Sequence, residues 1–192
     1  KEPWEYNESF NDAFRKAAEM KYQLMPYVYA QSKLASEKGL PMVRAFFIEF
    51  PDDPGAWLVD DAYLFGSDIL VAPLLHENTS SRPVYLPQGK WIDYQTGKVY
   101  ENGWHTIAAG EIPAVILVRN GAVIPHIKLA QSTSEMDWSK LDLVVYAAGS
   151  PALSGWVCLP ETNALRSVSV VSRGSGFQLV KDPFQGKVSW RI

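Results

Sequence analysis

The sequence predicts an α+β chain in which a helical and strongly apolar part, up to about residue 75, precedes an antiparallel β-sandwich. A long amphipathic helix and very apolar segments fill the first part, whereas short strands separated by Gly, Pro and Asn turns fill the second. With 192 residues, of which 47% are hydrophobic and 20% charged, the chain is long enough for one large domain or two small ones.

The long helix is predicted to begin within residues 7–9 and to end at residues 38–39. Asn and Ser are good N-caps, and glycine suits the left-handed position that follows a helix. Apolar side chains recur at helical spacing over the whole segment and give one broad apolar face. Pro26 lies inside this pattern. Because proline removes a backbone donor, we expect a kink there or two abutting helices.

Residues 41–51 are predicted to form a strand that is apolar on both faces. Such strands are typical of parallel sheets that are buried on both sides, and they need parallel neighbours. The sequence contains this helix-then-strand unit only once. We therefore interpret the first 75 residues as part of a larger α/β body that residues outside this sequence complete.

Two apolar segments, residues 63–65 and 69–75, follow across a turn, and from residue 83 onward short strands are predicted at even intervals. Turn signals occur at residues 95–97, 102–103 and 120–121, and the two Asn-Gly pairs among them favour tight hairpins. The expected strands are residues 84–86, 91–94, 98–100, 104–107, 114–118, 122–124, 141–147, 156–159, 167–171, 177–180 and 187–192, with a polar loop over 130–140. Their number and spacing indicate an antiparallel sandwich.

Motifs that carry chemistry are scarce. His76, His105 and His126 show no metal-ligand spacing, so we expect no metal and no cofactor, and we expect His105 to face solvent. The only cysteine, Cys158, is interpreted as a small buried hydrophobe rather than a reactive thiol. A net charge of −3 without a basic block argues against a nucleic-acid partner, and no apolar run reaches the roughly 20 residues of a membrane span.

Carboxylates are the remaining candidates for catalysis. Asp52 and Asp53 follow the apolar segment, but adjacent residues of an extended chain point in opposite directions. Two carboxylates that act together in hydrolysis are held about 5–9.5 Å apart across a pocket, which this pair could reach only at the active face of a barrel. Because Pro51 and Pro54 bracket the two aspartates, the sequence favours a structural turn.

Several blocks in order resemble glycoside hydrolase family 31, of the α-glucosidase and α-xylosidase type. KYQLMPYVY at residues 21–29 is similar to a late helix of that family, and GLPMVRAFFIEFPDDP at 39–54 to its last barrel strand and exit turn. YLFGSDILVAP at 63–73 resembles the passage out of the barrel. VYLPQGKW at 84–91 and VRNGAVIP at 118–125 resemble the proximal C-terminal sandwich.

The resemblance implies the C-terminal portion of a retaining α-glycosidase built on a (β/α)8 barrel. It implies barrel residues at 1–75, a proximal sandwich at 76–140, and the end of that sandwich or a reduced distal β domain at 141–192. The two catalytic aspartates of the family would lie upstream, so no catalytic residue is assigned within this chain. Trp4 is the one residue nominated as lying near the substrate pocket, and the alternative is a structural role for it.

The implied partners are the remainder of the parent enzyme and, through it, an α-linked oligosaccharide. α-Glucosidase and α-xylosidase activities both stay open, and a periplasmic or secreted bacterial enzyme is favoured over a cytoplasmic one. The alternative is a stand-alone sugar-binding sandwich that uses exposed Trp91, Trp104 or Trp156, since flat aromatic faces serve sugar binding as well as core packing.

Overall fold

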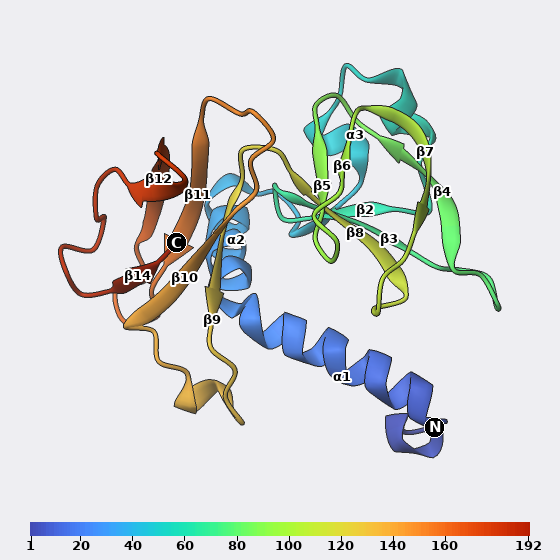
Figure 1. Ribbon diagram of the computed structural model, residues 1–192, viewed down its shortest axis with the longest axis horizontal. Coiled ribbons are helices and arrows are strands. Elements are labelled where there is room, and N and C mark those ends of the chain that lie inside the picture. Colours follow the sequence, from blue (N-terminus) through green and yellow to red (C-terminus); the bar gives the residue numbers. More distant parts are fainter. The chain divides into compact units, whose positions relative to one another are not determined.

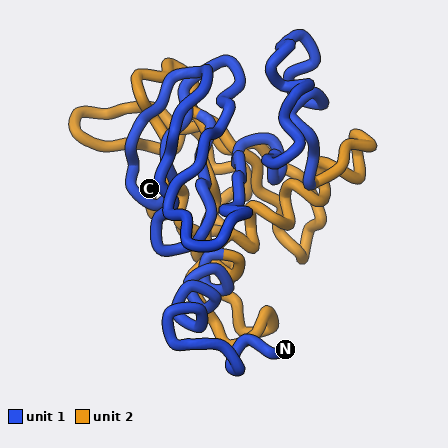
Figure 2. Tube along the Cα trace, turned by 90° about the vertical axis from the view of Figure 1, so that its right-hand side faces the viewer, with its two compact units in different colours: residues 1–20, 43–119 blue, residues 21–42, 120–192 orange.

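The computed structural model describes residues 1–192, and the chain divides into two compact units, each with its own core (Figure 2). Unit 1 comprises residues 1–20 and 43–119, and unit 2 comprises residues 21–42 and 120–192. No helix combines the length and the hydropathy that crossing a bilayer requires. These units reflect contacts within the chain. The domain boundaries predicted at residues 75 and 140 concern a longer enzyme and stay a prediction.

The long predicted helix is two abutting helices, α1 (Glu8–Gln23) and α2 (Met25–Lys38) (Figure 1). The Oδ1 atom of Asn7 accepts a hydrogen bond from the Phe10 N–H at 2.9 Å and caps the start of α1. Pro26 lies in the first turn of α2, where a missing backbone donor costs nothing. Gly39 ends α2 with a φ of 68°, in the left-handed conformation. The predicted ends and the break at the proline are confirmed.

The prediction of one continuous, doubly buried parallel strand over residues 41–51 is wrong. Only Val43–Arg44 is a strand, β1, and it pairs with β2 (Tyr63–Phe65) in the antiparallel sense. The chain then enters a single helical turn, α3 (Phe46–Glu49). This turn explains why apolar residues occur at both parities, because a helix places residues four apart on one side. Phe46 is fully buried there.

Unit 1 is a sandwich of two antiparallel sheets. The larger sheet has the order β1-β2-β3-β8-β5-β6, and the smaller one pairs β4 with β7. Alternate residues such as Leu70 and Leu117, which are register partners, meet Val84 and Ile107 of the smaller sheet in one buried cluster. The remaining strands of the unit are β3 (Ile69–Pro73), β4 (Ser81–Leu86), β5 (Trp91–Asp93), β6 (Val99–Tyr100), β7 (Gly103–Ala108) and β8 (Ala114–Arg119).

Only one of the three predicted turn signals closes a hairpin. Residues 95–97 join β5 to β6, and the Gly97 N–H donates to the Asp93 carbonyl at 2.8 Å. The two Asn-Gly pairs do not close hairpins, which corrects the prediction. Residues 102–103 carry the chain from β6 to β7 in the other sheet, and residues 120–121 carry it from β8 of unit 1 into unit 2. An Asn-Gly pair favours a local turn only. Which strands pair depends on how their side chains pack together in the core.

Unit 2 packs α2 with two three-stranded sheets, of order β14-β10-β9 and β11-β12-β13. Side chains from both sheets, among them Val123, Leu143, Val157 and Val168, form its buried core. Only the pair β10–β14 is parallel. The strands are β9 (Val123–Ile127), β10 (Lys140–Val145), β11 (Leu153–Cys158), β12 (Leu165–Arg173), β13 (Gly176–Leu179) and β14 (Ser189–Arg191). The predicted antiparallel sandwich is confirmed, but its strands begin before residue 75, because β1, β2 and β3 belong to the larger sheet of unit 1.

Candidate functional site

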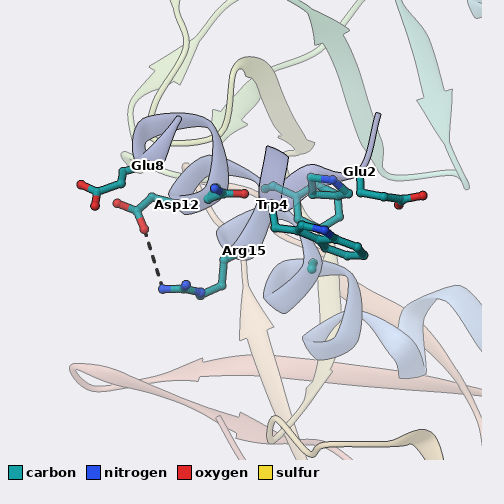
Figure 3. A pocket seen from close by; sticks show the side chains of 9 residues that line it. Glu2, Trp4, Glu8, Asp12 and Arg15 are labelled. Atoms are coloured by element: carbon teal, nitrogen blue, oxygen red, sulfur yellow. Dashed lines mark ion pairs between the residues drawn. The ribbon is translucent and has the colours of Figure 1, made fainter. Parts of the chain in front are cut away.

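The candidate site is an open hollow of about 890 Å³ at the beginning of the chain, in unit 1 (Figure 3). Short 3-10 helix η1 (Pro3–Glu5) and one side of α1 form it. The lining residues are Glu2, Pro3, Trp4, Glu8, Asn11, Asp12, Phe14, Arg15 and Ala18. Trp4, predicted from the sequence, is therefore part of the hollow. The lining residues from Glu8 to Ala18 lie on one side of α1, because residues spaced by three, four and seven share a helix face.

Trp4 offers a large aromatic surface at this hollow. Its side chain is 74% exposed, whereas the backbone around it is held by a local hydrogen bond from the Glu2 N–H to Oε2 of Glu5 at 2.6 Å. Next to it, Tyr6, Phe10 and Phe14 form an aromatic row along η1 and α1, with ring centroids 4.4 Å and then 6.3 Å apart. None of the side chains of α1 is buried. The hollow and the row together make an aromatic, solvent-facing surface.

The charged groups of the hollow are exposed and weakly coupled. Arg15 and Asp12 form an ion pair at 3.7 Å, with both side chains about two thirds exposed, drawn as the dashed line in Figure 3. Such exposed pairs contribute little to stability. A carboxylate becomes a proton donor near neutral pH when burial disfavours its charge, and Glu2, Glu8 and Asp12 are all exposed. The hollow is suited to contacting a polar ligand rather than to acid–base chemistry.

Asp53 has the structural role that the proline-bracketed sequence predicts. Its Oδ1 atom accepts hydrogen bonds from the Gly55 N–H at 2.9 Å and from the Tyr85 hydroxyl at 2.6 Å. The first bond caps η2 (Pro54–Leu58), and the second ties this turn to β4. Hydrogen bonding to the carboxylate raises the pKa of Tyr85 to about 12. Asp52 is exposed on the same turn.

The histidines and the cysteine do not form a metal site. No group of three or more His, Cys, Asp or Glu side chains has the arrangement of a metal site. His126 lies in β9, and burial lowers its pKa. His105 is half-buried in β7 against the Tyr100 ring, so the prediction that it faces solvent is wrong. Cys158 is buried, as predicted, and burial raises the pKa of its thiol.

The three tryptophans proposed for sugar binding have different environments. Trp91 is fully buried, and its indole N–H donates to the Pro87 carbonyl at 3.0 Å, so it belongs to the core. Trp156 on β11 is about one third exposed. Trp104 on β7 is 66% exposed and is the outward-facing aromatic of its strand.

Sequence reasoning missed a cluster of charges in unit 1. Arg44, which is almost fully buried, pairs with Glu49, and Arg119 lies 3.8 Å from the second oxygen of the same carboxylate. The Arg119 guanidinium also lies over the Phe50 ring at 4.9 Å. Burial raises the pKa of the neighbouring Asp68. The sequence predicts a strand that contains both Arg44 and Glu49. It gives no signal for their pairing, which depends on a helical turn between them.

The fold and the site define a β-sandwich protein with an N-terminal helical segment that presents an aromatic hollow and no buried pair of carboxylates. Comparisons with known proteins identify the family to which this chain belongs. Residues 39–124 match the model of the glycosyl hydrolase family 31 C-terminal domain, and residues 1–31 match the TIM-barrel domain of the same family. The chain belongs to glycosyl hydrolase family 31 and carries the end of the barrel followed by the C-terminal sandwich.

Relatives and solved structures agree with this assignment. Alpha-glucosidase 2 of Bacillus thermoamyloliquefaciens is 33% identical over 152 residues, which are 79% of this chain and 19% of the relative. An alpha-xylosidase of Saccharolobus solfataricus is 31% identical over 150 residues, 76% of this chain and 20% of the relative. The structure of a GH31 dextranase of Flavobacterium johnsoniae, complexed with isomaltotriose, superposes with a TM-score of 0.81 at 25% identity, covering 89% of this chain and 22% of that one. The chain thus spans about a fifth of the length of these proteins.

Proposed function

We propose that the protein to which this chain belongs is a retaining α-glycosidase that hydrolyses terminal α-glucosides or α-xylosides. Membership of glycosyl hydrolase family 31 supports this, together with relatives named as an alpha-glucosidase and an alpha-xylosidase at 33% and 31% identity. In such a mechanism one carboxylate attacks the sugar and a second donates and then removes a proton. We place both carboxylates in the remainder of the protein, because the acids described above are exposed, cap a turn, or, as with Glu49 and Asp68, belong to the charge cluster with Arg44 and Arg119.

The contribution of this chain is to complete the barrel wall and to support it. We assign residues 1–75 to the end of the barrel, 76–140 to the proximal sandwich and 141–192 to its end or to a reduced distal domain. The bonds of Asp53 to Gly55 and Tyr85 support this role, because they hold the turn after α3 against the sandwich of unit 1. The partner of this chain is the remainder of the same enzyme, and the substrate reaches it through that enzyme.

Activity of the whole protein tests the first part. The expected result is turnover of 4-nitrophenyl α-glucoside or α-xyloside, with the α-anomer as the first product seen by NMR. The 192-residue chain expressed alone should be inactive toward both. Absence of turnover by the whole protein, or turnover by the purified chain alone, would contradict the proposal.

We also propose that Trp4 lies beside the substrate pocket of the whole enzyme. Its exposed ring in the hollow supports a contact with the leaving sugar. Trp4→Ala should raise KM for a disaccharide about three- to tenfold, which is the size of one lost aromatic contact, and should leave thermal unfolding unchanged. Trp156→Ala, in unit 2, is the matched control. Equal kinetics for both variants would assign Trp4 a structural role only.

A further inference from the structure

The two-stranded sheet of unit 1 has an outward face with two aromatic rings side by side. Val84 and Ile107 point into the core, and the alternate residues Tyr85 and Trp104 lie on the other face of the sheet, where Tyr85 is half-buried against the edge of the core cluster and Trp104 is exposed. These two are register partners across β4 and β7, with ring centroids 5.5 Å apart and ring planes inclined by 57°. We name this pair, with the flanking register pair Pro83 and Thr106, the aromatic ledge.

The ledge is held rigid from beneath. The Tyr85 hydroxyl donates to Oδ1 of Asp53 at 2.6 Å, and the same oxygen accepts the Gly55 N–H at 2.9 Å. The Tyr85 ring occupies the space where any side chain at residue 55 would begin, so glycine is needed there for the ring to pack. Tyr85 is therefore fixed before any ligand arrives. Preorganised aromatic groups bind with a small loss of conformational entropy.

Trp104 extends this fixed ring into solvent. Its side chain is 66% exposed, in contrast to the fully buried Trp91 that serves the core of the same unit. The Trp91 indole N–H donates to a carbonyl, whereas the Trp104 indole N–H has no acceptor within the chain. A buried indole usually finds a partner for this group within the protein, as that of Trp91 does. The free donor of Trp104 is thus available to a ligand hydroxyl beside the flat face of the ring.

The ledge carries no charge. The next register pair is Ser81 and Ala108, and Arg82 lies on the opposite side of β4, bonded to Asp61 and to the Pro73 carbonyl. The Asp53 carboxylate beneath the ledge already accepts from the Tyr85 hydroxyl and the Gly55 N–H. An uncharged surface of flat rings with isolated hydrogen-bonding groups matches a neutral polyhydroxylated ligand. It does not match a phosphate-bearing or acidic one, which recruits Arg or Lys.

We propose that the aromatic ledge is an oligosaccharide-binding site, separate from the hollow at Trp4, that holds an α-linked glycan chain with one sugar ring stacked on Trp104. The choice of an α-linked glycan rests on the proposed function. The ledge would retain a polymeric substrate at the sandwich while its end is cleaved elsewhere, so it should affect long substrates and not short ones.

Affinity electrophoresis of the whole protein tests binding independently of catalysis. Native gels cast with soluble starch or with dextran, whose chains are α-linked, are expected to retard the protein in at least one case. Trp104→Ala should abolish most of the retardation, with an affinity about three- to tenfold weaker. Trp104→Phe should restore part of it, because a smaller aromatic face remains. Trp156→Ala, an aromatic substitution outside the ledge, should migrate like the parent protein.

Kinetics separate the failure of this proposal from failure of the proposed function. Trp104→Ala should lower kcat/KM on the retained polymer by the same factor and leave turnover of 4-nitrophenyl α-glycosides unchanged. Equal retardation of the parent and Trp104→Ala proteins in both gels overturns the ledge, whatever the activity. Protection of Trp104 from acrylamide quenching in the whole protein also overturns it, since another part of the protein would then cover the ring. Lack of glycosidase turnover contradicts the proposed function alone.

Discussion

At the scale of single residues, Asp53 joins three features that lie far apart in the sequence. It caps η2, fixes the Tyr85 hydroxyl, and thereby supports the ring next to Trp104. The sequence alone predicted that Asp53 forms a turn, from the flanking prolines. It gave no indication of the bond to Tyr85, because the two residues are 32 positions apart and only the packed sandwich brings them together.

Asp53→Ala should lower the free energy of unfolding by about 1–3 kcal/mol, because it removes a helix cap and a hydrogen bond to a hydroxyl. The pKa of Tyr85, about 12 in the folded protein, should fall toward its ordinary value of 10. Urea unfolding and an ultraviolet titration of tyrosine check the two expectations.

The pH dependence has a definite sign. A raised folded-state pKa favours the neutral phenol, so the stability from the Tyr85–Asp53 bond is present below pH 10 and is lost between about pH 10 and 12. In the Asp53→Ala protein this loss should be absent. Tyr94 is the internal control, because burial alone raises its pKa to about 12. An unchanged titration of Tyr85 in the variant would show that the bond does not form.

At the scale of elements, the units are fixed by close contacts between layers. Gly155 on β11 is the clearest case in unit 2, because a Cβ atom there would overlap the carbonyl oxygen of Val123 on β9. Because the overlapping atom belongs to the backbone, it cannot move away by changing a side-chain rotamer. The side chain of the neighbouring Ser154 is exposed, and its backbone N–H donates to the Gly121 carbonyl.

Gly155→Ala should therefore destabilise the protein by about 3 kcal/mol, at the upper end of overpacking effects. Ser154→Ala, one residue away on the outward face, should change the free energy of unfolding by less than about 0.5 kcal/mol. Chemical denaturation of the two variants beside the parent protein provides the comparison. Similar stabilities for both would mean that β9 and β11 are not packed as closely as described.

The same scale shows how far element assignment could go from the sequence. The helices, the break at Pro26 and most strands follow from periodicity, capping and turn residues, which are local properties. The prediction of a strand over residues 41–51 is wrong because an apolar run fits a buried strand and a helical turn equally well. In the structure this run contains the helical turn α3, and Arg44 pairs with Glu49 at the end of that turn.

At the scale of the whole molecule, the proposed function implies that α1 is covered by the remainder of the barrel. Tyr6, Phe10 and Phe14 are each between 42% and 50% exposed in this chain. Large apolar side chains left in water forgo about 1.5–3 kcal/mol each, and an exposed row of them marks an interaction surface.

The chain expressed without the rest of the protein should therefore self-associate or bind a hydrophobic dye, and its first 75 residues should be sensitive to protease. Phe10→Ser with Phe14→Ser should reduce dye fluorescence, whereas Trp156→Ser in unit 2 should have a smaller effect. Light scattering, dye titration and limited proteolysis supply the measurements. A monodisperse, protease-resistant monomer that ignores the dye would contradict a covered α1.

The sequence by itself determined the family, the two helices around Pro26, the succession of short strands and the turn role of Asp53. Each of these features depends on a residue and its near neighbours in the sequence. Their backbone preferences and the spacing of their hydrophobic side chains can be recognised from the sequence. These features are therefore local properties of the chain.

Only the tertiary structure decided which strands pair, that neither Asn-Gly turn closes a hairpin, and that Trp104 rather than His105 faces outward on β7. It alone joined Asp53 to Tyr85 and Arg119 to Glu49. The physical reason is that partner choice depends on side chains from distant positions filling one core together. A one-residue change of register turns every side chain of a strand to the other face, and local sequence does not fix that register.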